Sequence, residues 1–300
     1  MSRKIDFELP KAVSRFEQIM KQRLLIRTIF YKKVFGGKGL EFDSYRLYNP
    51  ETDDSQLIDW KATMKNPSRI LVRQYVEERD LKLFFIIDIG ENMVFGSDNL
   101  KAKVVAQFAA SLSHLILSSG DSVGFAIFSD KILKMALPGG GIEQYYSLAR
   151  ELQNPNNYGG KSNLGRALRL IVPNLKGISA VFLLTDFINL DTQALKMLKI
   201  LASEQETVGL MIRDRVDNEL PKLSREVVIE DIYTGEQKVI NPSLIREQYR
   251  LKSLEQKNQI YELFRRTGSD IKEFTTDQDY LVSLADFLRM RIKRRKVSKR

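Results

Sequence analysis

The stretch from Leu83 to Gly96 constrains the fold of this chain more than any other part of it. Its sequence, LFFIIDIGENMVFG, opens with five consecutive apolar residues and turns polar at Asp88. A short apolar run that ends in turn-prone residues is typical of a strand buried on both faces, as in a parallel sheet. In open α/β sheets, ligands bind outside the carboxyl ends of the strands. Asp88 is therefore predicted to lie at the ligand-binding edge of a sheet.

Strands and helices are predicted to alternate after this stretch. Further strands are expected at 123–128, 132–137, 179–184 and 207–212, and helices at about 100–118, 142–153, 164–173 and 192–204. These assignments rest on apolar runs for the strands and on apolar residues at helical spacing for the helices. Such alternation indicates βαβ units. We therefore predict an α/β fold with a doubly wound, mostly parallel sheet flanked by helices.

The length of 300 residues suits one large α/β domain with an appendage. Residues 1–80 are predicted to be an N-terminal extension packed on the main domain, with a helix at about 10–34 and Trp60 as a buried anchor. The main domain is predicted at 81–292, with a small β-hairpin insertion near 224–241. A long polar helix at 242–267, a strand at 271–274 and a helix from 279 follow. Residues 293–300 form a basic tail.

Composition excludes some classes of protein. The chain has no cysteine, which excludes a disulfide framework and a thiolate metal site. It has neither an apolar run long enough to cross a membrane nor a signal peptide, so we expect a soluble, cytoplasmic protein. Of the net charge of +10, eight charges lie within 289–300, which leaves +2 on the rest. Basic ends on a balanced body are typical of solvated tails, so nucleic-acid binding is not expected.

Polar residues follow two of the predicted buried strands. Asp88 and Asp186 each end a strand, and a polar loop around Ser162 lies between them in sequence. Strand ends meet at the switch point of a doubly wound sheet. Oxygen ligands gathered there suit a hard cation such as Mg²⁺. The other interpretation is that each aspartate caps the next helix or fixes a turn, and the sequence leaves both open.

Three short motifs resemble the metal-ion-dependent adhesion site of von Willebrand factor A domains: DxGxN at 88–92, GKSN at 160–163 and LLTDF at 183–187. The resemblance implies a von Willebrand factor A-like, Rossmann-type fold and a Mg²⁺ site. Its implied metal ligands are Asp88, Asn92, Ser162 and Asp186. Gly90 stands where these domains have a metal-binding serine, so the resemblance implies an attenuated site.

The wider sequence resembles the domain of unknown function 58 family. The motifs that carry this resemblance are YRxYxP at 45–50, IDWK at 58–61, RxYxxE at 73–78, MxFG at 93–96, GDxVG at 120–124, RD at 213–214 and LP at 220–221. The family implies a non-enzymatic adaptor that acts with a MoxR-type AAA+ ATPase in assembling or activating other proteins. The partner would be that ATPase or its client.

Two other functions remain as alternatives. A metal-assisted hydrolase would use Asp88 and Asp186 as ligands and Glu91 as the base. The single histidine, His114, argues against a Ser-His-Asp triad or a histidine-rich metal site. Nucleic-acid binding through the basic termini is the second alternative.

Overall fold

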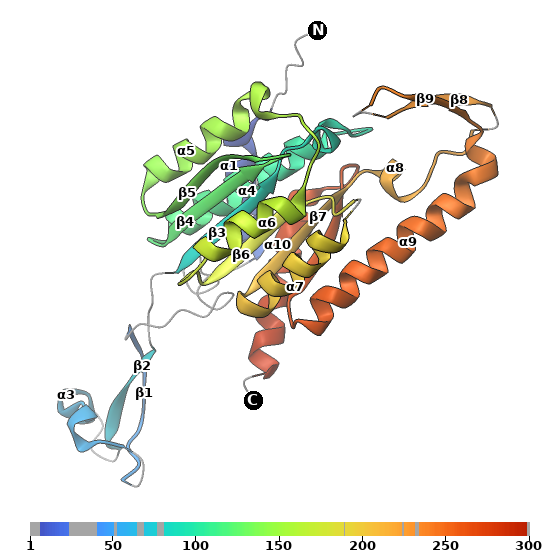
Figure 1. Cartoon of the computed structure of the whole chain (residues 1–300). Helices are drawn as coiled ribbons and strands as arrows, with labels where there is room; N and C mark the ends of the chain where they lie inside the picture. Colours follow the sequence, from blue (N-terminus) through green and yellow to red (C-terminus); the bar gives the residue numbers. More distant parts are fainter. Residues whose placement is uncertain are drawn as a thin grey trace. The chain divides into compact units, whose positions relative to one another are not determined.

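A computed structural model describes residues 7–23, 41–50, 53–64, 69–76, 81–188, 190–223, 225–231 and 234–298 (Figure 1). The chain divides into two compact units. The larger, here called the sheet domain, comprises Met1–Val34 and Lys82–Arg300, and the smaller unit comprises Phe35–Leu81. The predicted extension of residues 1–80 is thus divided between the two units. How the smaller unit packs on the sheet domain stays a prediction.

The sheet domain is organised around a six-stranded sheet with strand order β10-β7-β6-β3-β4-β5. The strands are β3 (Lys82–Asp88), β4 (Ser122–Phe128), β5 (Ile132–Gly139), β6 (Ala180–Thr185), β7 (Thr207–Arg213) and β10 (Asp270–Thr275). Every neighbouring pair is parallel except β4 and β5. Counted along the chain, this is the doubly wound order 3-2-1-4-5-6, whose direction reverses between β3 and β6. The predicted fold class is confirmed.

Helices cover both faces of the sheet (Figure 1). They are α4 (Lys101–Leu117), α5 (Ile142–Gln153), α6 (Leu164–Ile171), α7 (Thr192–Glu204), α9 (Pro242–Arg266) and α10 (Tyr280–Ser298). Phe84 and Ile86 of β3 share one apolar cluster with residues of α6, α7 and α9. Phe108 of α4 packs edge-on against Phe274 of β10. Because both faces are covered, the central strands are apolar at nearly every position, and for that reason they were recognisable from sequence.

The helix α1 (Leu9–Arg23) precedes the smaller unit in sequence but packs on α4 and α10 of the sheet domain. Phe16 is fully buried in this contact. Two polar contacts flank it, one between Glu17 and the His114 ring at 3.0 Å and an ion pair of Arg15 with Asp279 at 2.5 Å. The predicted helix at 10–34 is confirmed up to Arg23, and its remainder lies outside the described residues.

The smaller unit consists of the antiparallel strands β1 (Glu41–Leu47) and β2 (Leu71–Val76), the short turn η1 (Ser55–Leu57) and helix α3 (Trp60–Thr63). Asp59 is buried and caps α3, with its Oδ1 accepting hydrogen bonds from the backbone N–H groups of residues 61 and 62 at 3.0 Å. Its Oδ2 accepts from the Tyr45 hydroxyl at 2.9 Å. Trp60 is 62% exposed, so it is not buried within the smaller unit, and its predicted role as an anchor on the sheet domain stays a prediction. The aspartate beside it, and not the indole, turns inward.

The C-terminal region adds a one-turn helix α8 (Arg215–Asn218) and a hairpin of β8 (Val227–Glu230) and β9 (Gln237–Ile240), where the sequence predicts one. Helix α10 continues to Ser298, through most of the predicted basic tail. Arg291 is buried in it and pairs with Glu206 at 2.5 Å and Asp270 at 2.7 Å. Among the described residues, no helix combines the length and apolarity needed to cross a bilayer.

Candidate functional site

Asp88 ends β3 at the point where the strand order reverses, and it is 1% exposed. Its Oδ2 accepts hydrogen bonds from the hydroxyls of Ser162 at 2.8 Å and Thr185 at 2.7 Å, and its Oδ1 accepts one from the Gly90 N–H at 2.9 Å. These donors are all neutral. Burial and the nearby charge of Asp186 raise the pKa of Asp88 to about 6. The carboxylate is therefore held in place without a neutralising charge from these partners.

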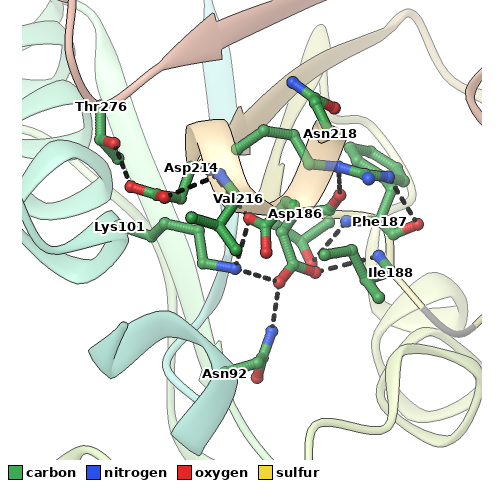
Figure 2. Close-up of polar contacts among 12 residues, drawn as sticks. Asn92, Lys101, Asp186, Phe187, Ile188, Asp214, Val216, Asn218 and Thr276 are labelled. Atoms are coloured by element: carbon green, nitrogen blue, oxygen red, sulfur yellow. Dashed lines mark hydrogen bonds and ion pairs between the residues drawn. The ribbon is translucent and has the colours of Figure 1, made fainter. Parts of the chain in front are cut away.

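Asp186 follows β6 directly, and its environment differs from that of Asp88. Its Oδ2 accepts hydrogen bonds from the Asn92 side-chain amide at 2.8 Å and the Lys101 ammonium at 2.9 Å, and its Oδ1 accepts one from the Ile188 N–H at 3.0 Å (Figure 2). Burial alone would raise the pKa of Asp186, but Lys101 and the hydrogen bonds hold it below its usual range. Asp186 is therefore already neutralised within the protein.

Lys101 is the first residue of α4, and its side chain is 2% exposed. Its ammonium also contacts Asp217 Oδ2 at 2.9 Å, so it bridges two carboxylates. Burial opposes the charge, but the two carboxylates raise the pKa of Lys101 above its usual value. Lys101 is not among the site residues predicted from the sequence. A signal was present, because Lys101 lies at helical spacing on the apolar stripe that continues through Val104 and Phe108.

The backbone turn after Asp186 is strained. Phe187 has φ 53°, in the left-handed region that residues other than glycine rarely adopt. Its ring is fully buried against Phe264. The buried Arg213 side chain holds the turn, with Nε donating to the Asp186 carbonyl at 2.6 Å and Nη2 to the Phe187 carbonyl at 3.4 Å. The strained backbone therefore lies at the predicted site, and Arg213 of β7 stabilises it.

Helix α8 fixes the second carboxylate that binds Lys101. Asp214 caps the helix by accepting a hydrogen bond from the Val216 N–H, while Asp217 accepts one from the Asp214 N–H at 2.8 Å. Asp214 is fully buried and also accepts a hydrogen bond from the Thr276 hydroxyl at 2.7 Å (Figure 2). The N–H and the hydroxyl of Ser97 donate to it as well, both at 2.8 Å. The polar network therefore extends from β6 to the loop after β10.

The four predicted ligands come together as two hydrogen-bonded pairs, Asp88 with Ser162 and Asn92 with Asp186. At Gly90 a side chain has no room, because a Cβ atom there would lie 2.6 Å from Asn92 Oδ1 and 2.8 Å from Ser162 Cβ. Asn92 Oδ1 is buried without a hydrogen-bond partner in the described part of the chain.

These residues can be tested as a set of metal ligands. The carboxylate of Asp88, the unpaired amide oxygen of Asn92 and the hydroxyl of Ser162 are hard oxygen donors, which fit a Mg²⁺ ion that keeps part of its water shell. Asp186 fits less well because its Oδ2 is already paired with the Lys101 ammonium. Among the described residues, no group of three or more His, Cys, Asp or Glu side chains is placed to hold a metal ion. Any ion here would depend on the mixed donor set.

Comparisons with known proteins identify a family for this chain and several similar structures. The family described as "Protein of unknown function DUF58" matches residues 44–259. An uncharacterized protein of Mycobacterium tuberculosis (strain ATCC 25618 / H37Rv) is 23% identical over 260 residues, which cover 85% of this chain and 80% of the relative. An uncharacterized protein of Mycobacterium bovis matches to the same extent.

Similar solved structures include the conserved hypothetical protein BatB from Bacteroides thetaiotaomicron, with 15% identity, a TM-score of 0.46, and coverage of 71% of this chain and 99% of that one. The SpRpn10 von Willebrand factor A domain has 12% identity and a TM-score of 0.40, with coverage of 70% and 95%. The von Willebrand factor type A protein from Catenulispora acidiphila has 11% identity and a TM-score of 0.38, with coverage of 73% and 43%. Because all three TM-scores lie below 0.5, the fold is assigned from the strand order and not from these likenesses.

The family match covers more than two thirds of the chain and includes both β3 and β6, whose ends hold the two aspartates. This chain, with its von Willebrand factor A-like α/β fold, therefore belongs to the DUF58 family.

Proposed function

We propose that this protein is a non-enzymatic binding module for other proteins, and that its binding face is the edge of the sheet domain where β3 and β6 end. The observation that carries the proposal is the convergence of residues from separate loops at the switch point, around Asp88 and Asp186. This is the edge at which doubly wound folds bind their ligands.

The proposed face includes a weak Mg²⁺ site formed by Asp88, Asn92 and Ser162. The unpaired Asn92 Oδ1 and the lack of a cationic donor among the named partners of Asp88 support this assignment. A bound ion would supply an open coordination position for an acidic side chain of the partner. Asp186 orients the Asn92 amide through its hydrogen bond to Nδ2.

The proposed partner is a MoxR-type AAA+ ATPase or a client of that ATPase, in the assembly or activation of other proteins. The support is the resemblance to the DUF58 family. The test is a pull-down with the ATPase encoded nearest to this chain, performed in Mg²⁺ and in EDTA, with wild type and Asp88→Ala. We expect the wild type to capture the ATPase in Mg²⁺ but not in EDTA, and Asp88→Ala to capture it in neither. Equal capture in all of these conditions would contradict the proposed face.

The metal component has a direct test that needs no partner. We expect millimolar Mg²⁺ to raise the melting temperature of the wild type by a few degrees, because an ion that binds only the folded state stabilises it by mass action. Asp88→Ala should abolish this response. Glu204→Ala, an exposed acid at the end of α7, is the matched control and should keep it. Identical Mg²⁺ responses in all three proteins would refute the metal site.

A further inference from the structure

The position of Lys101 is unfavourable for a cation in two respects. It is the first residue of α4, where the helix dipole favours negative charge. Its side chain is 2% exposed, and a buried ammonium loses its hydration. Any apolar side chain would extend the stripe of α4 into the core without either cost. The two carboxylates that meet Lys101 offset both costs.

Lys101 also changes what Asp186 can do. The Asp186 Oδ2 atom already accepts two hydrogen bonds, one from the lysine and one from Asn92. The other oxygen of Asp186 accepts one from the Ile188 N–H. Asp88 accepts the same number of hydrogen bonds, so what sets Asp186 apart is the positive charge of Lys101, which would repel a second cation. Asp88, by contrast, accepts only from Ser162, Thr185 and the Gly90 N–H among its named donors, all of them neutral.

We propose that Lys101 is the resident cation of this site and the residue that determines its affinity for divalent ions. Its ammonium takes the role that a metal ion would otherwise have toward Asp186. Mg²⁺ is therefore restricted to the side of the site formed by Asp88, Asn92 and Ser162. This inference rests on the proposed Mg²⁺ site for its account of the wild type, and it adds a residue that the metal-site motifs do not include.

The test is a calorimetric Mg²⁺ titration of the full chain carrying Lys101→Met, together with its melting temperature. Methionine fills a similar volume without charge. We expect Lys101→Met to melt below the wild type without Mg²⁺, to bind Mg²⁺ at least ten-fold more tightly, and to recover most of the lost melting temperature when the ion is added. Adding Asp186→Asn to Lys101→Met should abolish the gain.

Lys103→Met is the matched control, because it removes the same charge from the same helix. The Lys103 side chain is 24% exposed and pairs with Glu8 instead of with the site. Its Mg²⁺ affinity should stay within about two-fold of the wild type. An equal gain in Mg²⁺ affinity in both variants would mean that net charge alone causes the effect, and it would overturn the proposal. The proposal would also be overturned if Lys101→Met bound Mg²⁺ no more tightly than the wild type.

A second variant keeps the proposal testable if Lys101→Met does not fold without Mg²⁺. Lys101→Gln removes the charge but can still donate a hydrogen bond to Asp186, so it should fold more readily and bind Mg²⁺ more tightly than the wild type. A Lys101→Gln variant that binds Mg²⁺ no more tightly than the wild type would overturn the inference. If the wild type binds no Mg²⁺ but Lys101→Met does, the resident cation stands and the proposed wild-type metal site fails.

Discussion

Gly90 and Asn92 adjoin each other at the candidate site, so the size of one side chain limits the size of the other. The backbone at Gly90, with φ −60° and ψ 170°, is open to any residue, so the glycine is not there for conformational freedom. The reason is space, because the amide of Asn92 and the Cβ of Ser162 occupy the volume that a side chain would take. The glycine at position 90, in place of the serine of the metal-site motif, therefore accompanies the larger amide at position 92.

Restoring the serine alone should consequently harm the protein. We expect Gly90→Ser to lower the free energy of unfolding by about 1–3 kcal/mol, the usual cost of overpacking, without improving Mg²⁺ binding. The double variant Gly90→Ser/Asn92→Ser removes the clash with Asn92 but not the one with the Cβ of Ser162, so it should recover part of the stability and bind Mg²⁺ more tightly than the wild type. Urea unfolding measures the first effect and calorimetry the second. A single variant as stable as the wild type would refute the steric account.

At the scale of elements, the one-turn helix α8 has more polar anchors than its length suggests. Asp214 begins it, Asp217 binds Lys101, and the carbonyl of Asp217 accepts a hydrogen bond from Ser253 of α9 at 3.0 Å. A short helix held at three points joins the candidate site to the longest helix of the fold. Movement of Asp214 or Asp217 would therefore affect both the candidate site and α9.

The anchoring of α8 predicts a dependence of stability on pH. Burial opposes the charge on Asp214, but the hydrogen bonds from Ser97, Thr276 and Val216 hold its pKa below the usual value. A depressed carboxylate pKa stabilises the fold above the unfolded value of about 3.9, and this stability is lost as pH falls further. We expect the urea midpoint to fall from pH 5 to pH 3, and Asp214→Asn to flatten that decline. An equally steep decline in the variant would contradict the assignment.

At the scale of the whole molecule, the start of the basic run, at Arg291, is part of the fold. Arg291 ties α10 to Glu206, just before β7, and to Asp270, the first residue of β10. We expect Arg291→Met to cost about 1–3 kcal/mol, because it removes a buried cation that pairs with two acids. Deleting residues 293–300 should change the free energy of unfolding by less than about 0.5 kcal/mol. Thermal or urea unfolding of the two variants checks this, and equal losses would refute the distinction.

The sequence predicts the sheet well and the site only in part, for physical reasons. The strands β3 and β6 are buried on both faces, so their composition alone identifies them, and the doubly wound alternation brings Asp88 and Asp186 together. Lys101 escaped prediction because charge patterns are ordinarily assigned to solvated surfaces. The burial of Arg291 depends on packing between distant segments, which no local pattern records.

The connectivity of the two units has a mechanical consequence. The smaller unit leaves the sheet domain after α1 and returns to it at β3, so both of its ends are attached to the same folded body. A load applied to the smaller unit would be shared between two anchors of unequal strength. Helix α1 is held by side-chain contacts that can separate one at a time, whereas β3 is bonded in register to a strand on each side. Under tension, α1 would detach first, and the central strand that carries Asp88 would resist.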